Sequence, residues 1–126
     1  VKQDSRRIEV YSDEDIIWHL PYNVKAQDCI LADVDHDRED ELLVLCWKRG
    51  RYGKHRPTWV KRDEFKWSQH IFIYEINDHT VRPKWMASDI GMNAVSWKFS
   101  EGILSIEDTD GIITKWIWRT WGLEKL

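Results

Sequence analysis

Acidic side chains stand at every second position between residues 33 and 41. Hard cations such as calcium take about six to eight oxygen ligands from carboxylates, backbone carbonyls and water. Without a cation, carboxylates held this close together would repel one another. The pattern therefore predicts a cation site, with candidate ligands Asp33, Asp35, Asp37, Glu39 and Glu41.

The spacing of these residues excludes an EF-hand. Such a loop needs Gly at its sixth position and a bidentate Glu at its twelfth, and counting from Asp33 places Arg38 and Val44 there. The residues fit a shorter loop from Asp33 to Glu41, in which Glu39 contributes its backbone carbonyl and the other four contribute carboxylates. The alternative is a charged hairpin turn that binds no ion.

The segments on either side of this loop position it. Residues 29–32 and 42–47 are short apolar runs, typical of buried strands, so the loop joins two antiparallel strands. The whole stretch, LADVDHDREDELLVL, resembles the repeat of the FG-GAP and VCBS families, which form the blades of integrin α-chain-type β-propellers. The resemblance implies a Ca²⁺-binding hairpin loop with Asp33, Asp35, Asp37 and Glu41 as side-chain ligands and Glu39 as a backbone ligand.

One position departs from that family. The family usually has Gly after the third acidic ligand, where this chain has Arg38. A side chain in the left-handed conformation costs about 1–2 kcal/mol. The departure therefore predicts either weaker metal binding or a loop that persists without metal.

The rest of the chain predicts a single all-β module over residues 1–126. It has 42% hydrophobic residues, with nine Trp to fill a core, and none of its apolar runs has sustained helical periodicity. The expected strands, besides those flanking the loop, are at residues 8–11, 16–20, 71–76, 81–86, 97–99, 103–106 and 112–118.

Two parts of the chain share an order of features. Repeat-like units at about 16–76 and 83–121 each run from a Trp-containing strand to an acidic turn and a strand ending in Trp. With the resemblance, this predicts antiparallel sheets forming two blade-like β-propeller repeats. A propeller needs about four or more blades. The chain would be a partial propeller, be completed by other chains or domains, or pack its sheets in its own way.

A basic and aromatic segment, 48–67, interrupts this acidic protein. Guanidinium groups beside aromatic faces suit sulfated or carboxylated sugars, phosphate groups or nucleic-acid bases. The alternative is a solvated loop that covers the side of a sheet. The candidate ligand-binding residues are Arg49, Arg51, Tyr52, Lys54, His55, Arg56 and Trp59.

These features favour a non-enzymatic calcium-binding module that presents loops to a protein or polysaccharide ligand in an extracellular or cell-surface setting. One alternative is an anionic polysaccharide or polyanion-binding module using the basic segment. Another is a fragment of a carbohydrate-active enzyme, with Asp89, Glu101 or Asp108 as candidate carboxylates. The net charge of −3 argues against nucleic acid as the partner. No apolar run suits a membrane span, and the first residues do not resemble a signal peptide.

The two cysteines test the register of the predicted hairpin. A loop from Asp33 to Glu41 places Cys29 opposite Cys46 or one step from it. Antiparallel neighbours are close enough for a disulfide, and an oxidising compartment would allow one. A one-residue change of register turns the two side chains to opposite faces and forbids it. Both outcomes remain open.

Overall fold

The computed structural model describes residues 1–49, 67–77, 79–87 and 90–126. These residues form strands and no helix, which confirms the all-β prediction, and among them no helix has the length and apolar character that crossing a membrane requires. The strands are β1 (Lys2–Asp4), β2 (Arg7–Ser12), β3 (Asp15–His19), β4 (Val24–Ala32), β5 (Glu41–Arg49), β6 (Trp67–Asn77), β7 (Thr80–Met86), β8 (Ala94–Ser100), β9 (Ile103–Asp108), β10 (Ile113–Arg119) and β11 (Gly122–Lys125).

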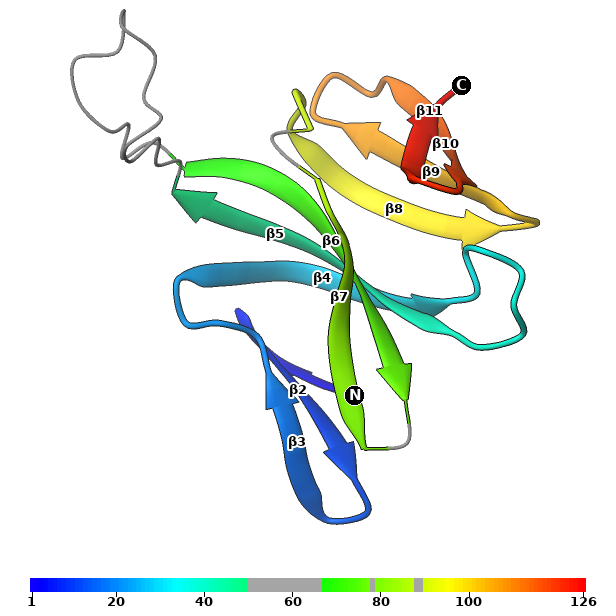
Figure 1. Cartoon of the computed structure of the whole chain (residues 1–126). Helices are drawn as coiled ribbons and strands as arrows, with labels where there is room; N and C mark the ends of the chain where they lie inside the picture. The colour runs from blue at the N-terminus through cyan, green and yellow to red at the C-terminus, as the bar shows by residue number, and fades with distance from the viewer. Residues whose placement is uncertain (50–66, 78, 88–89) are drawn as a thin grey trace, which may run out of the picture.

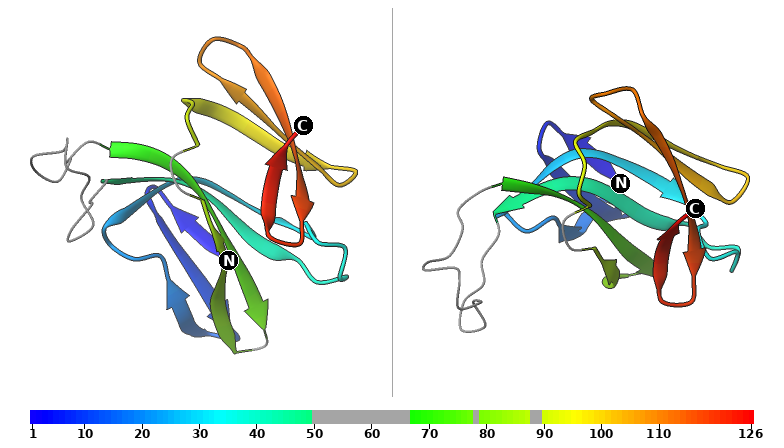
Figure 2. Two further views of the ribbon diagram at one scale, coloured as in Figure 1. Left: turned by 45° about the horizontal axis from the view of Figure 1, so that its top comes forward. Right: turned by 90° about the horizontal axis from the view of Figure 1, so that it is seen from above.

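The strands make three antiparallel sheets in which each strand pairs with its neighbours in sequence (Figure 1). Their orders are β1-β2-β3, β4-β5-β6-β7 and β11-β10-β9-β8, and none of them closes into a barrel. The β4–β7 sheet lies between the other two, as the turned views in Figure 2 show. The antiparallel all-β fold is therefore as predicted, whereas the assignment of the sheets as propeller blades stays a prediction.

The middle sheet is buried on both faces. The run from Leu42 to Cys46 in β5 is entirely buried, because alternate side chains enter two different cores. Leu42, Val44 and Cys46 pack with Ile8 and Val10 of the first sheet. Leu43 and Leu45 pack in a second core, shared with Leu104, Ile106 and Leu123 of the third sheet. A continuous apolar run is what a strand covered on both sides needs.

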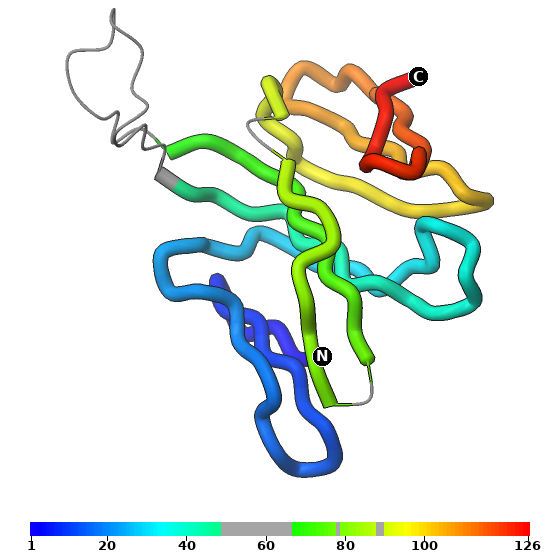
Figure 3. Tube along the Cα trace, in the orientation of Figure 1, coloured from blue at the N-terminus to red at the C-terminus, as the bar shows by residue number. Residues whose placement is uncertain are grey.

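The acidic loop joins β4 to β5 beside the third sheet. Ala32 pairs with Glu41, so Glu41 is the first residue of β5 and the loop itself ends at Asp40. Val34 is 1% exposed and lies in the second core. The ring of His36 lies against the backbone of Gly102, in the turn between β8 and β9. The Cα trace in Figure 3 shows this loop next to that turn.

The register of this hairpin keeps the two cysteines apart. Cys29 pairs with Val44, and Cys46 pairs with Ala26 beyond a bulge at Gln27. Both thiols are free: Cys29 donates to Gln3 Oε1 at 3.3 Å, and Cys46 to the His70 carbonyl at 3.6 Å. The open choice between a bridge and two thiols is thus settled in favour of thiols. The expected spacing was wrong because Glu41 belongs to the strand, which places Cys29 opposite Val44. The bulge then moves the partner of Cys46 one residue further, to Ala26.

Thiol titration is expected to find two free thiols in unfolded, unreduced protein. In the native protein at pH 8, Cys46 should be almost unreactive towards a thiol reagent, because burial raises its pKa to about 12 and the thiolate is the nucleophile. The Cys29→Ser and Cys46→Ser variants would assign each reaction. Fewer than two thiols in monomeric, unreduced protein would contradict the register.

The acidic turns of the two predicted repeat units occupy different places in their sheets. The acidic turn of the first unit joins β4 to β5, the first two strands of their sheet. In the second unit, Asp108 ends β9 and Asp110 lies in the turn to β10, and these two strands are the middle ones of their sheet. The last strand, β11, was not expected from the sequence. Its four residues are too few to show an alternating pattern.

Candidate metal site

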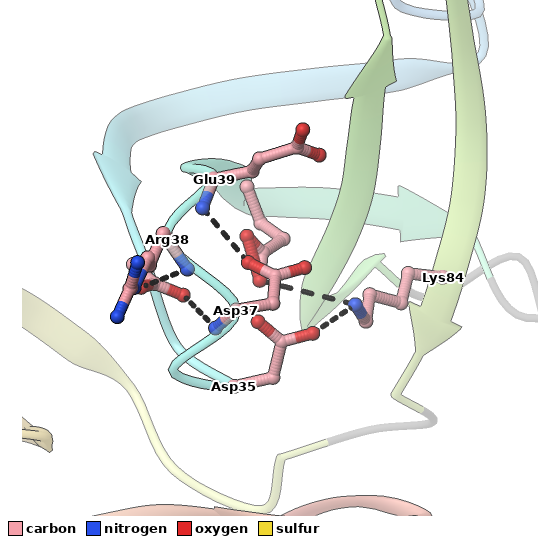
Figure 4. Close-up of polar contacts among 7 residues, drawn as sticks. Asp35, Asp37, Arg38, Glu39 and Lys84 are labelled. Atoms are coloured by element: carbon pink, nitrogen blue, oxygen red, sulfur yellow. Dashed lines mark hydrogen bonds and ion pairs between the residues drawn. The ribbon is translucent and has the colours of Figure 1, made fainter.

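The acidic loop is folded by its first carboxylate. Asp33 Oδ1 accepts a hydrogen bond from the Asp37 amide at 3.1 Å, and Asp33 Oδ2 accepts one from the Arg38 amide at 2.9 Å. The Glu39 amide donates to Asp37 Oδ1 at 2.9 Å. Arg38 has a φ of 72° and His36 a φ of 59°, so the left-handed conformation expected at Arg38 is present. These contacts curl the chain so that Asp35 and Asp37 face one region beside Lys84, whereas the Glu39 carboxylate points away from it (Figure 4).

Four carboxylates converge at that point. One oxygen from each of Asp33, Asp35, Asp37 and Glu41 lies within 4.8 Å of the other three. The group is the one predicted for side-chain ligation, and it could hold a metal ion. It contains only oxygen donors, which is the ligand set of a hard cation rather than of zinc or copper.

Two oxygens of the group have no hydrogen-bond partner among the residues that the structure describes. They are Asp35 Oδ1 and Glu41 Oε1, and both are buried. Glu41 is only 2% exposed, because it begins β5 and pairs with β4 on one side and β6 on the other. A buried polar atom without a partner costs about 1–3 kcal/mol. A cation bound between these oxygens would remove that cost, so the residues present fit an oxygen-coordinated ion.

Lys84 is the residue at this site that the sequence did not reveal. It extends from β7, and its Nζ contacts Asp35 Oδ2 and lies 3.9 Å from Glu41 Oε1 (Figure 4). The same ammonium lies 5.7 Å from the centre of the Trp118 ring in the third sheet, within cation–π range. Its position 49 residues along the chain from Asp35 gives no local pattern to detect.

The charges of the site are strongly coupled. Burial and the neighbouring Asp35 raise the pKa of Glu41 to about 8, although Lys84 acts against this shift. Burial alone would raise the pKa of Asp35 too, but contacts with Glu41 and Lys84 hold it well below its usual range. Burial opposes the charge of Lys84, yet Asp35 and Glu41 raise its pKa. The Lys84 ammonium therefore offsets only part of the negative charge of the four carboxylates, and the remainder favours a bound cation.

The remaining predicted site residues are placed differently. The Glu39 carboxylate is exposed and is not part of the converging group, which agrees with a backbone rather than a side-chain role. Arg49 ends β5, opposite Trp67, and its side chain is not described. The other candidate ligand-binding residues lie outside the described residues: Arg51, Tyr52, Lys54, His55, Arg56 and Trp59.

The candidate catalytic carboxylates belong to turns. Asp108 Oδ1 accepts hydrogen bonds from the Asp110 amide at 2.9 Å and the Ile112 amide at 3.0 Å, as Asp33 does in the acidic loop. Glu101 has a φ of 53° in the β8–β9 turn. Asp89 lies outside the described residues. Asp108 and Glu101 thus have structural roles in hairpin turns.

Comparison with known proteins gives no family for this chain. No protein-family model matches it, and no significant match was found among curated proteins or among solved structures. The functional argument therefore depends on the geometry of the site.

Proposed function

We propose that this chain is a non-enzymatic calcium-binding β module, with Ca²⁺ held by Asp33, Asp35, Asp37 and Glu41 and by the backbone carbonyl of Glu39. The observation that carries the proposal is the convergence of four carboxylates of which two have buried oxygens without partners. The Lys84 ammonium already occupies part of this acidic site, which supports a preference for positive charge there.

Calcium suits this loop better than magnesium does. Magnesium requires near-ideal octahedral geometry and keeps several of its waters, whereas calcium accepts many carboxylate oxygens in an irregular arrangement. Here the ligands come from one short loop and the first residue of a strand, so their geometry is set by the chain rather than by the ion. Water and the Glu39 carbonyl would complete the coordination.

The surrounding architecture supports a module for binding rather than for catalysis. The β4–β7 and β8–β11 sheets each have four antiparallel strands in sequence order, and the blades of a β-propeller are four-stranded sheets. We place the protein in an extracellular or cell-surface setting, where calcium is plentiful enough for weak sites with a Kd on the order of 10⁻⁴–10⁻³ M. The ligand of such a module would be a protein or a polysaccharide.

Calorimetric titration of chelator-treated protein with CaCl₂ tests the proposal. We expect one calcium ion per chain, weaker binding of MgCl₂, and a rise in melting temperature with calcium. An ion at about 100 times its Kd stabilises the native state by about 2.7 kcal/mol. Asp35→Asn should abolish both responses, because it removes a ligand charge while keeping the size of the side chain.

The matched control is Asp40→Asn. Asp40 is an exposed residue of the same loop and is not in the converging group, so this variant has the same charge change and should keep the calcium response. Wild-type protein that shows neither heat of binding nor thermal stabilisation with calcium would overturn the proposal. Lys84 would then be the permanent cation of this loop.

A further inference from the structure

A second site lies at the end of β5 away from the acidic loop. A cavity of about 500 Å³ opens there, within the size range of small-molecule sites. None of its lining residues belongs to the metal site. They are Arg6, Lys25, Ala26, Gln27, Trp47 and Trp67.

A β-bulge builds this cavity. Gln27 is the extra residue of β4 between Ala26 and Asp28, and bulges commonly re-aim a side chain next to a functional site. Gln27 Oε1 accepts hydrogen bonds from Trp47 Nε1 at 2.9 Å and from Gln69 Nε2 at 2.7 Å. Gln69 is 1% exposed and is itself held by the backbone of Ala94. The Trp47 ring is thus fixed in place by a buried amide network.

The two indoles lie along one face of the sheet. Trp47 pairs with Gln69, and Trp67 stands two residues from Gln69 on the same strand, so the three side chains share a face. Diagonal neighbours of this kind have Cα atoms roughly 7–8 Å apart. Trp67 is 38% exposed. Two rings in a row on a sheet offer an apolar surface to an elongated ligand.

The described lining residues of the cavity carry positive charge. Among them are two cations and no carboxylate, in a chain whose net charge is −3. The Arg6 carbonyl accepts a hydrogen bond from the Ala26 amide at 2.9 Å, which fixes the β1–β2 turn beside β4. Lys25 Nζ donates to the Tyr22 carbonyl at 3.2 Å. The nearest acidic residue in sequence, Asp28, is engaged by Trp97 Nε1 at 2.9 Å.

We propose that this cavity binds an acidic oligosaccharide, a linear chain of uronic acid residues. The apolar faces of the sugar rings would pack on Trp47 and Trp67, whose large rings gain from contact with C–H groups. A carboxylate of the sugar would pair with the Arg6 guanidinium, whose fork of donors matches two carboxylate oxygens. The proposal uses none of residues 50–66 and does not depend on calcium.

The test is a titration with tetragalacturonate in the presence of EDTA, so that calcium binding by the protein or by the sugar has no part in the result. Calorimetry gives the affinity, and the indole N–H signals of Trp47 and Trp67 in proton–nitrogen correlation spectra report the place of binding. We expect binding of the acid tetramer, at least about tenfold weaker binding of its methyl ester, and no binding of AMP. Arg6→Gln and Trp67→Leu should each weaken binding at least about fivefold.

Matched controls are Arg82→Gln and Trp121→Leu, two exposed residues that do not line the cavity. Both should bind the tetramer as wild type does, and circular dichroism should show the same fold for all four variants. No binding of the tetramer, equal binding of its ester, equal loss in the controls, or tighter binding of AMP would each overturn the proposal.

Discussion

Replacing Lys84 with Met is expected to destabilise the calcium-free protein and to strengthen calcium binding. In the calcium-free state the change leaves Asp35 and Glu41 without their cation, and breaking a largely buried pair of this kind costs about 3 kcal/mol. Protonation of Glu41 relieves part of this cost, so we expect a loss of about 2 kcal/mol, or roughly 8 °C in melting temperature.

The gain in calcium affinity has an electrostatic cause. An ammonium a few ångströms from a dication repels it. The interaction energy of two unit charges about 4 Å apart is about 4 kcal/mol at an effective dielectric constant of 20. Solvent and the flexible Lys84 side chain reduce this, so we expect calcium binding at least about tenfold tighter than in wild type. Thermal melts with and without calcium and calorimetric titration measure the two effects.

Two control variants test whether both effects depend on the positive charge at position 84. Lys84→Arg keeps a cation near Asp35 and should change neither quantity greatly. Lys115→Met removes an exposed cation of β10 and should leave calcium binding as it is. Weaker calcium binding in Lys84→Met would mean that the lysine supports the bound ion rather than competing with it.

Replacing Gly122 with Ala is expected to cost about 3 kcal/mol of stability, or roughly 12 °C in melting temperature. A Cβ at this position would lie 2.6 Å from Trp85 Cε2, well inside contact distance. The φ of Gly122 is 151°, a conformation that side chains rarely adopt. Trp85 is packed in the second core, so its ring has little room to withdraw.

The control for this variant is another glycine with positive φ. Gly111 has a φ of 78° and nothing within 4 Å of an added Cβ, so Gly111→Ala should show only the conformational cost of about 1 kcal/mol. Combining Gly122→Ala with Trp85→Leu should recover part of the loss if the clash is its cause. Equal melting temperatures for the two single Ala variants would contradict the close packing of β11 on β7.

The features that the sequence predicted are those encoded by neighbouring residues. The run from Leu42 to Cys46 indicated a fully buried strand, because no polar residue interrupts it, and the strand is buried on both faces. The alternation of Asp33, Asp35 and Asp37 places three carboxylates on one side of a tight loop. In both cases residues close in sequence determine the local geometry.

The features that it did not predict depend on distant residues. Lys84 reaches the acidic loop only because β7 is placed beside it by the pairing of β6 with β7. The bulge at Gln27 has no signature in the order of apolar and polar residues, yet it changes the register and re-aims the side chain that holds Trp47. The expected cysteine pairing was wrong because the loop ends at Asp40 rather than Glu41, and one residue decides which positions face each other.

The first and third sheets cover the two faces of the middle sheet and turn their own outer faces away from it. In the first sheet the face turned away from the core carries the pairs Lys2 with Glu9 and Asp4 with Arg7. Lys115 and Ser105 pair on the corresponding face of the third sheet.

The same outer faces also carry apolar side chains. Tyr11 pairs with Ile16 in the first sheet and Ile113 pairs with Glu107 in the third, and the three apolar residues are 37%, 54% and 60% exposed, respectively. Another sheet or chain packed on either face would gain from burying these apolar side chains and would have to pair the charged ones beside them.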